Sequence, residues 1–224
     1  MSTFLELCQS LRQECGVSGT GPTAVTSQTG MNKKLVDWIN RAWKEVQSAR
    51  PDWLWMRKSF SFSTIASTGN YTASGISLTD VGNWYRYTFR VYLTSGGVAG
   101  EVDLPWIPYD DWRDGYGIGE QVEDFPICFT IKPDKSLQIA PIPNSIYTIS
   151  GEYRQSAQSL SANADEPGLP AEFHNLIIYK AMMFYGAHEG APDVYADGKE
   201  QYRILRNAMI LDQTSPMEDA EPLA

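Results

Sequence analysis

Three cysteines and two histidines are the side chains of this sequence best suited to nucleophilic, acid–base or soft-metal chemistry. Cys8 and Cys15 lie seven residues apart, close to two helical turns, so on a helix they share one face. Neither belongs to a Cys-x-x-Cys pair, and no histidine pair follows at zinc-finger spacing. We therefore expect Cys8, Cys15 and Cys128 to pack in the core as reduced thiols, since unpaired cysteine is among the most buried residue types.

The two histidines, His174 and His188, fall fourteen residues apart on one predicted helix, near the same face. A Ser-His or Cys-His nucleophile would need one of them. The sequence contains no Gly-x-Ser-x-Gly elbow and no His-Glu-x-x-His pair. We predict no catalytic residue, no metal ligand and no cofactor.

Adjacent carboxylates raise the possibility of glycoside hydrolysis, which needs two such groups across a cleft. The pairs are Asp110-Asp111, Glu123-Asp124, Asp165-Glu166 and Glu218-Asp219. In a chain with 27 acidic residues such pairs arise by chance, and the sequence places no two of them opposite each other. We interpret them as solvated faces and turns.

Aromatic residues offer a second alternative, a sugar-binding module, because exposed rings stack on sugars. The candidates are Trp53, Trp55, Trp84, Trp106 and Trp112. Aromatic side chains with one polar tip are equally at home in protein interfaces. The sequence therefore favours binding over catalysis.

Composition limits the remaining classes. The 224 residues carry 18 Lys and Arg against 27 Asp and Glu, a net charge of −9, which argues against tight sequence-independent binding of nucleic acid. No apolar run approaches the roughly 18 residues needed to cross a bilayer, and the start lacks a signal-peptide pattern. We expect a protein that is made in the cytoplasm and has no membrane partner.

Helical spacing marks both ends of the chain. Phe4 to Cys15 and Met31 to Ala49 form amphipathic patterns, with Thr3 as the N-cap of the first helix and Pro51 ending the second. After Pro170 the helical period returns, is broken by Gly186, Gly190 and Pro192, and resumes from Val194 to Leu211. The sequence predicts two helices at each end.

The middle of the chain alternates with the period of β-strands. The predicted strands lie around Phe60 and Phe62, from Tyr85 to Leu93, from Ile127 to Ile131, from Leu137 to Ala140 and from Ser145 to Arg154. The segment between Leu104 and Asp124 has no assignable period.

We predict an α+β protein in which the terminal segments form a four-helix cluster and an antiparallel β domain, a small sandwich or barrel, is inserted. The helical domain is expected over residues 1–56 and 162–224, and the β domain over residues 57–161. Leu35, Ile39 and Val46 should then share a core with Phe173, Ile177 or Leu205.

Several stretches resemble one known family. They are Phe4–Cys8, Arg12–Gly19, Gln28–Gly30, Leu35–Trp43 with Val46-Gln47, Leu137–Pro143, Gly151–Arg154, and Asp165–Pro170 leading into Phe173. In this order they are similar to head-to-tail adaptor (connector) proteins of tailed bacteriophages, which include tail tubular protein A. The similarity extends over nearly the whole chain.

The resemblance implies a structural virion protein in the neck between capsid and tail. Adaptors of this kind form a homo-oligomeric ring, expected to be a dodecamer, dock on the portal protein and receive the downstream tail or nozzle protein. DNA passes through the ring without specific binding. Because some phage connectors have been credited with cell-wall hydrolysis, the alternative function is a tail-associated cell-wall hydrolase.

The last thirteen residues, from Asp212 to Ala224, carry four acids, two prolines and no base. We expect them to be disordered in the free subunit and to become ordered against the portal. The predicted portal-binding residues are Pro216, Met217, Glu218, Asp219, Glu221, Pro222 and Leu223.

Overall fold

The computed structural model describes residues 2–19 and 21–214, and the chain divides into two units. One unit comprises Met1–Met56 and Ala157–Ala224, and the other comprises Arg57–Ser156. Helices and antiparallel sheets occur together, which confirms the predicted α+β class.

Helices build the first unit. They are α1 (Phe4–Glu14), α2 (Gly30–Ser48), the 3-10 turns η1 (Leu54–Met56) and η5 (Ala171–Phe173), α4 (Asn175–Glu189) and α5 (Pro192–Gln213). A capping box starts α1 at the predicted place, because the Glu6 N–H donates to Thr3 Oγ1 at 3.3 Å and the Thr3 N–H donates to the Glu6 carboxylate at 2.8 Å.

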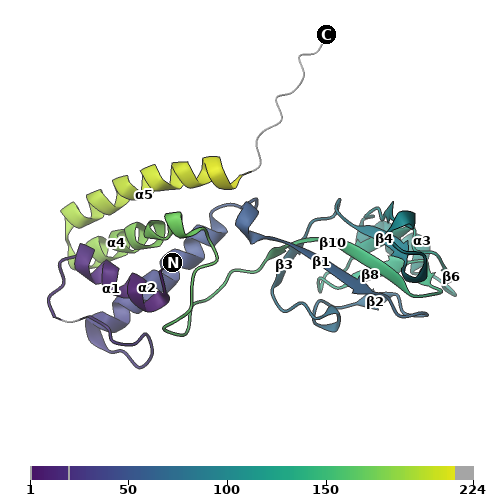
Figure 1. The fold of residues 1–224 in the computed structure, drawn as a ribbon, viewed down its shortest axis with the longest axis horizontal. Helices are drawn as coiled ribbons and strands as arrows, with labels where there is room; N and C mark the ends of the chain where they lie inside the picture. The colour runs from purple at the N-terminus through teal and green to yellow at the C-terminus, as the bar shows by residue number, and fades with distance from the viewer. Residues whose placement is uncertain (1, 20, 215–224) are drawn as a thin grey trace, which may run out of the picture. The chain divides into compact units, whose positions relative to one another are not determined.

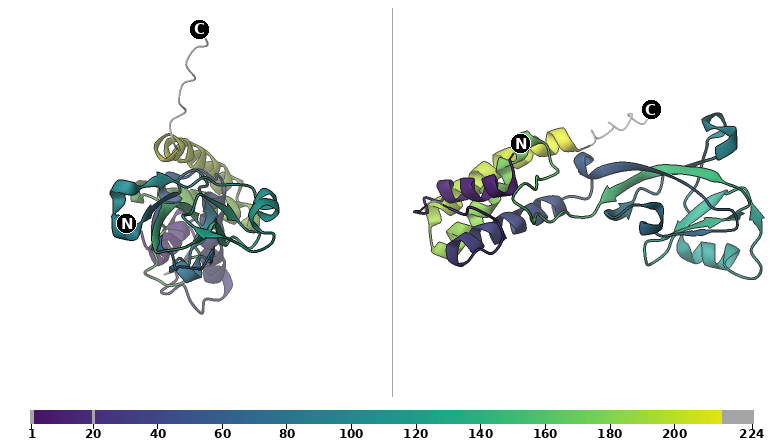
Figure 2. Two further views of the ribbon diagram at one scale, coloured as in Figure 1. Left: turned by 90° about the vertical axis from the view of Figure 1, so that its right-hand side faces the viewer. Right: turned by 60° about the horizontal axis from the view of Figure 1, so that its bottom comes forward.

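The helix α4 lies at the centre of this unit, where it contacts α1, α2 and α5 (Figures 1 and 2). Leu35, Ile39 and Val46 of α2 belong to the same buried cluster as Phe173 and Ile177. The N-terminal and C-terminal segments therefore share one hydrophobic core, as neither pair of helices could bury its apolar face alone.

Two glycines let α4 and α5 approach closely. A Cβ atom on Gly186 would lie 2.7 Å from the Tyr195 nitrogen, and one on Gly198 would lie 2.8 Å from the Met182 Cβ. The prediction that Gly186 breaks the helix is therefore wrong: α4 continues through it to Glu189, and the glycine serves the packing of α5.

Short strands build the second unit. They are β1 (Arg57–Ser63), β2 (Asn70–Tyr71), β3 (Val81–Trp84), β4 (Arg90–Leu93), β5 (Val102–Asp103), β6 (Glu123–Asp124), β7 (Cys128–Ile131), β8 (Leu137–Ala140), β9 (Ile142–Pro143) and β10 (Tyr147–Gln155). Between them lie α3 (Tyr109–Tyr116) and the 3-10 turns η2 (Ser74–Ile76), η3 (Thr94–Gly96) and η4 (Val98–Gly100).

The long strand β10 organises the larger sheet. Five strands follow the order β1-β10-β4-β5, with β3 also paired to β10, and all of these pairs are antiparallel. A three-stranded antiparallel sheet has the order β2-β8-β7, and β6 pairs with β9 in parallel.

Alternation along β10 separates the faces of the sheet. Tyr147, Ile149 and Tyr153 are buried in an aromatic core, whereas Ser150 and Glu152 have the opposite parity. Phe89 and Phe129 stack in this core with ring centroids 4.0 Å apart.

The predicted strand from Tyr85 to Leu93 is wrong in its first half. β3 ends at Trp84 and β4 begins at Arg90, with a turn between them. Thr88 closes this turn, because its N–H and its hydroxyl both donate to the Tyr85 carbonyl, at 3.2 and 2.8 Å. Tyr87 lies in the turn and is 89% exposed.

Candidate interaction surfaces

The three thiols lie in the interior. Cys8 and Cys15 are buried at α1, and burial raises the pKa of each thiol to about 12. Cys128 is buried in β7. The prediction that these cysteines pack in the core is confirmed. Within residues 2–19 and 21–214, no group of three His, Cys, Asp or Glu side chains could hold a metal ion.

The histidines make structural contacts. His174 is buried just before α4, where its Nδ1 atom accepts a hydrogen bond from the Ser2 N–H at 3.1 Å and its Nε2 atom lies 3.2 Å from the Leu169 carbonyl. The ring satisfies both contacts when it is neutral with the proton on Nε2. Burial lowers the pKa of His174, which favours that neutral form.

His188 is exposed in the last turn of α4. Its Nδ1 atom lies 2.7 Å from the Glu189 carboxylate and its Nε2 atom 2.9 Å from Lys34 Nζ. Both ring nitrogens of each histidine thus have a polar partner. Among the described residues, no cysteine or serine side chain is a partner of either histidine.

The predicted carboxylate pairs lie in separate places. Asp110 pairs with Arg113 in α3, Asp124 lies in β6, and Asp165 accepts hydrogen bonds from the Ser161 and Ala162 N–H groups in a loop. Glu218-Asp219 lies outside the described residues. The acidic pairs that the structure describes therefore act in loops and ion pairs.

The five tryptophans proposed as sugar platforms contribute to packing instead. Trp53, Trp84 and Trp112 are buried, and the indole N–H groups of Trp53 and Trp84 donate to the Val46 and Lys135 carbonyls. Trp55 stacks on Trp43 with ring centroids 5.3 Å apart. The Arg86 guanidinium carbon lies over Trp106, 4.2 Å from the ring centroid. These rings do not form an open stacking surface.

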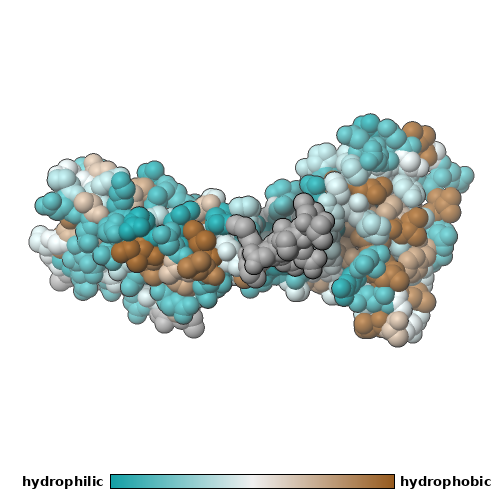
Figure 3. All heavy atoms as spheres, turned by 90° about the horizontal axis from the view of Figure 1, so that it is seen from above, coloured by the Kyte–Doolittle hydropathy of each residue, from teal (hydrophilic) through white to brown (hydrophobic). Residues whose placement is uncertain are grey.

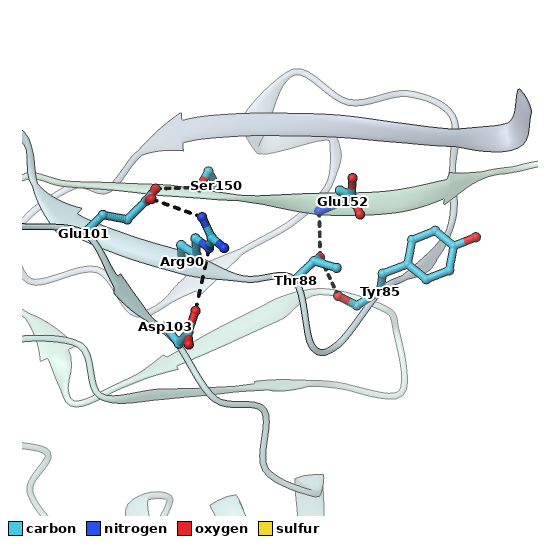
Figure 4. A network of polar contacts seen from close by, with 7 residues as sticks. All are labelled: Tyr85, Thr88, Arg90, Glu101, Asp103, Ser150 and Glu152. Atoms are coloured by element: carbon cyan, nitrogen blue, oxygen red, sulfur yellow. Dashed lines mark hydrogen bonds and ion pairs between the residues drawn. The ribbon is translucent and has the colours of Figure 1, made fainter. Parts of the chain in front are cut away.

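A polar groove of about 480 Å³ crosses the outer face of the larger sheet. Figure 4 shows its polar contacts, which come from β4, β5, β10, the turn before β4 and Glu101 at the end of η4. Arg90 lies 3.4 Å from the Glu101 carboxylate and 3.6 Å from that of Asp103, and the Ser150 hydroxyl donates to Glu101 at 3.5 Å.

Glu152 makes the polar contacts at the other end of the groove. Its N–H donates to Thr88 Oγ1 at 3.0 Å, and its carboxylate pairs with Arg57, whose guanidinium lies over the Tyr85 ring at 4.9 Å. Every carboxylate that lines the groove is paired with an arginine. The groove therefore offers fixed donors and acceptors for a partner.

A second hollow, which we call the α3 groove, has a volume of about 310 Å³ and mostly apolar walls. It is lined by Gly115, Tyr116, Ile118, Glu120, Gln121, Val122, Ala140, Pro141 and Ile142. Ile118 and Val122 are 72% and 70% exposed. Exposed apolar side chains beside a hollow are typical of protein contact surfaces.

The exposed face of α5 is the third surface. Only Gly198 and Met209 of this helix are buried, whereas Ile204 is 52% and Leu211 is 85% exposed. Seven residues separate Ile204 from Leu211, so they lie on one side of the helix two turns apart. The upper part of Figure 1 shows α5 on the outside of the helical unit, and Figure 3 views the molecule from that side.

The predicted portal-binding residues, 216–219 and 221–223, lie outside the described residues, so the structure brings none of them into a site. The polar groove, the α3 groove and the exposed face of α5 were not predicted from the sequence. Helical and strand periodicity identifies the residues of a buried face, whereas these surfaces are exposed. Ile118 and Val122 could have been found as apolar residues within an acidic run, and Leu211 as an apolar residue beside Asp212.

None of the helices that the structure describes is long and apolar enough to cross a bilayer. A search of curated proteins found no match. The sequence profile of the family described as SU10 adaptor protein, a phage head-to-tail adaptor family, matches residues 2–219, which include both units. The predicted resemblance to phage adaptors is confirmed, and the chain belongs to the SU10 adaptor protein family.

Proposed function

We propose that this protein is the head-to-tail adaptor in the neck of the virion, where it docks on the portal protein and provides the attachment site for the next tail or nozzle protein. The observation that carries this proposal is the family match, which extends over residues 2–219 rather than over one unit. The predicted organisation, a helical domain of residues 1–56 and 162–224 and a β domain of residues 57–161, supplies a separate part for each neighbour.

The proposed assembly is a closed ring, with a dodecamer as the expected size. In such a ring each copy meets the next through two different surfaces, and the ring closes only when the rotation per copy divides the circle. Twelve copies with a charge of −9 each would carry about −108, so the protein as a whole would attract DNA little. A channel in a protein with this negative net charge suits DNA that must pass through without binding.

We propose that residues 216–219 and 221–223 bind the portal. Met217 and Leu223 would supply apolar anchors, and Glu218, Asp219 and Glu221 would face basic residues. Each contact would be modest because ordering the segment costs conformational entropy, but repetition around a ring adds avidity.

Truncation after Gln213 tests the role of this segment. The truncated chain should keep its thermal stability, since the residues removed follow the last residue of α5, while its binding to purified portal should weaken. A full-length control with Glu218→Gln, Asp219→Asn and Glu221→Gln separates charge from chain length. If the truncated protein bound portal as well as the intact protein, portal docking would have to be reassigned to the described helices.

We also propose that ring formation depends on the portal or on high concentration, because a ring that closed freely in the cytoplasm would compete with ordered assembly. Native mass measurement of the isolated protein should show mainly monomers, and addition of portal should produce the multi-copy complex. A stable large ring without portal would contradict this dependence while leaving the adaptor role intact.

A further inference from the structure

Strand β1 is a long edge of the larger sheet. It extends over seven residues, Arg57–Ser63, and among the described strands it pairs with β10 alone (Figure 1). We infer that this edge binds an extended segment of the next tail or nozzle protein, which pairs with β1 as an added strand. The inference rests on the proposed adaptor role, because it names how the downstream protein attaches.

Hydrogen bonds show which backbone groups of β1 point outward. The Thr64 N–H donates to the Tyr147 carbonyl at 2.7 Å, so the positions two and four residues before Thr64 also bond to β10. The Glu152 carbonyl accepts from the Tyr85 N–H at 3.0 Å on the other side of β10, and it is therefore directed away from its register partner, Ser59. The residues of β1 whose N–H and C=O groups point away from β10 are Arg57, Ser59, Ser61 and Ser63.

These outward groups form an unprotected row. Among the described residues, no backbone hydrogen bond outside the pairing with β10 involves a residue of β1. Proline, charged side chains and β-bulges are the usual protection of a sheet edge. The stretch from Ser59 to Ser63 reads Ser-Phe-Ser-Phe-Ser, its serines are exposed, and its pairing with β10 has no bulge. Such an edge favours pairing with a strand of another molecule.

The other edges of the β unit are short or covered. Apart from the central strand β10, every other strand that the structure describes has at most four residues. The outer side of β7 is bonded to a loop: the Ile107 N–H donates to the Phe129 carbonyl at 2.9 Å, and the Phe129 N–H donates to the Pro105 carbonyl at 3.0 Å. A long partner strand would therefore pair with β1.

The same comparison argues against a second copy as the occupant. Two copies that paired β1 with β1 would form a closed two-fold contact, which leaves neither edge free for a third copy and cannot build the proposed ring. A head-to-tail contact would need a second long edge, and the described strands offer none.

The chain's own segment after Gln213 is a poor candidate too. It is rich in acids, alanine and proline, which are disfavoured in strands, and we assign it to the portal. The downstream protein is then the neighbour that remains for the β unit.

The side chains of β1 define the strand that fits. Phe60 is buried and Phe62 is half-buried on the core side of the sheet, whereas Ser59 lies on the other side and lines the polar groove. The added strand should therefore alternate, with apolar residues beside the phenylalanines and small or polar residues beside the serines.

Hydrogen exchange at single-residue resolution tests the pairing directly. Wild-type protein is measured alone, bound to portal, and bound to portal after each purified tail protein of the same phage is added in turn. The Ser59, Ser61 and Ser63 amides should exchange fast in the first two states. With the attached tail protein they should slow at least about tenfold, because an amide bonded in a sheet exchanges only when the pairing opens.

The Phe60 and Phe62 amides are the internal control, since they bond to β10 and should exchange slowly in all three states. Serine amides that stay fast in a complex containing the tail protein would overturn the inference. Slow exchange before the tail protein is added would overturn it as well, because the chain itself, another copy or the portal would then cover the edge.

Proline substitution gives a second measurement. Ser61→Pro removes one outward N–H, a change that an edge strand tolerates, and should weaken binding of the tail protein about tenfold or more. Ser61→Ala is the matched control, because it removes the hydroxyl but keeps the N–H, and it should bind like wild type. Equal binding by the two variants, both folded by thermal melting, would contradict strand pairing. If Ser61→Pro does not fold, the exchange data on the wild-type protein decide.

The proposed function is read separately, from attachment itself. If a tail protein joins the adaptor–portal complex while the serine amides stay fast, strand pairing is wrong and the adaptor role stands. If none of the tail proteins joins the complex, the attachment role falls and this inference falls with it.

Discussion

Lys180 of α4 is the residue at which three helices of the helical unit meet. Its Nζ atom lies 3.0 Å from the Glu45 carboxylate on α2 and 5.3 Å from the Tyr202 ring centroid on α5. Arg41 contacts the same carboxylate at 3.0 Å and lies 4.2 Å from the Phe184 ring centroid. The lysine side chain is only 20% exposed, so its ion pair is less screened by water than an open surface pair.

Replacement of Lys180 tests this junction. Lys180→Met should lower the free energy of unfolding by about 1 kcal/mol, because it removes one ion pair and two ring contacts. Lys33→Met is the matched control, since Lys33 pairs with Asp37 on the open surface and should cost less than about 0.5 kcal/mol. Denaturant unfolding of both variants measures the difference, and equal costs would contradict the proposed role of Lys180.

His174 gives the molecule a predicted pH dependence. Burial lowers the pKa of His174 below the ordinary value of 6.5, so at acid pH the unfolded chain binds a proton that the folded chain excludes. The stability that this histidine contributes is complete above pH 6.5 and is lost as the pH falls from 6.5 to the folded pKa.

Melting curves between pH 8 and pH 5 check this dependence. The wild-type melting temperature should fall over that window. His174→Asn should be less stable at pH 8, because it loses a ring contact, but its curve should be flatter. Parallel curves for the two proteins would show that another group controls the acid response.

At the scale of elements, the close approach of α4 and α5 depends on glycine. Gly186→Ala should destabilise the protein by about 1 to 3 kcal/mol, since the new methyl group would lie 2.7 Å from a backbone nitrogen and 2.8 Å from the Tyr195 Cβ. This cost outweighs the roughly 1 kcal/mol that alanine gains in a helix.

Gly115→Ala is the matched control for that substitution. Gly115 also lies in a helix, α3, and a Cβ atom there would meet nothing within 4 Å. The control should leave stability unchanged or raise it by up to about 1 kcal/mol. If Gly186→Ala behaved like the control in thermal unfolding, the tight packing of α4 on α5 would be contradicted.

Elements with a clear period could be predicted from the sequence. The helices Phe4–Glu14 and Gly30–Ser48 agree with their patterns, because each buries one face. The strand Leu137–Ala140 also lies where it was predicted, although all four of its residues are buried. The turn at Tyr85–Thr88 was not predicted, because the apolar residues on either side of it alternate as they would in one continuous strand. The helix Tyr109–Tyr116 has one buried residue, Trp112, and thus too little periodicity to detect.

The candidate surfaces could not be predicted in the same way. A groove forms where α3 and the following loop meet the strands β8 and β9, and strand pairing over long sequence separations sets that meeting. Exposed residues such as Ile204 carry no signature until the helix around them is known to be on the surface. The family, by contrast, could be predicted, since the order of several short stretches along the chain carries the resemblance.

At the scale of the whole molecule, we propose that many copies of this chain assemble on the portal and join it to the tail. The match to the SU10 adaptor protein family over residues 2–219 supports an adaptor.

Native mass spectrometry of the wild-type protein mixed with the portal protein of the same phage tests this assembly. We predict one dominant complex that contains a full portal and a fixed number of adaptor copies, expected to be twelve. Peptidoglycan incubated with the same preparation should release no soluble fragments. A portal that stays free of this protein at saturating concentration, or peptidoglycan turnover that disappears when His174 or a paired carboxylate is replaced, would contradict the adaptor role.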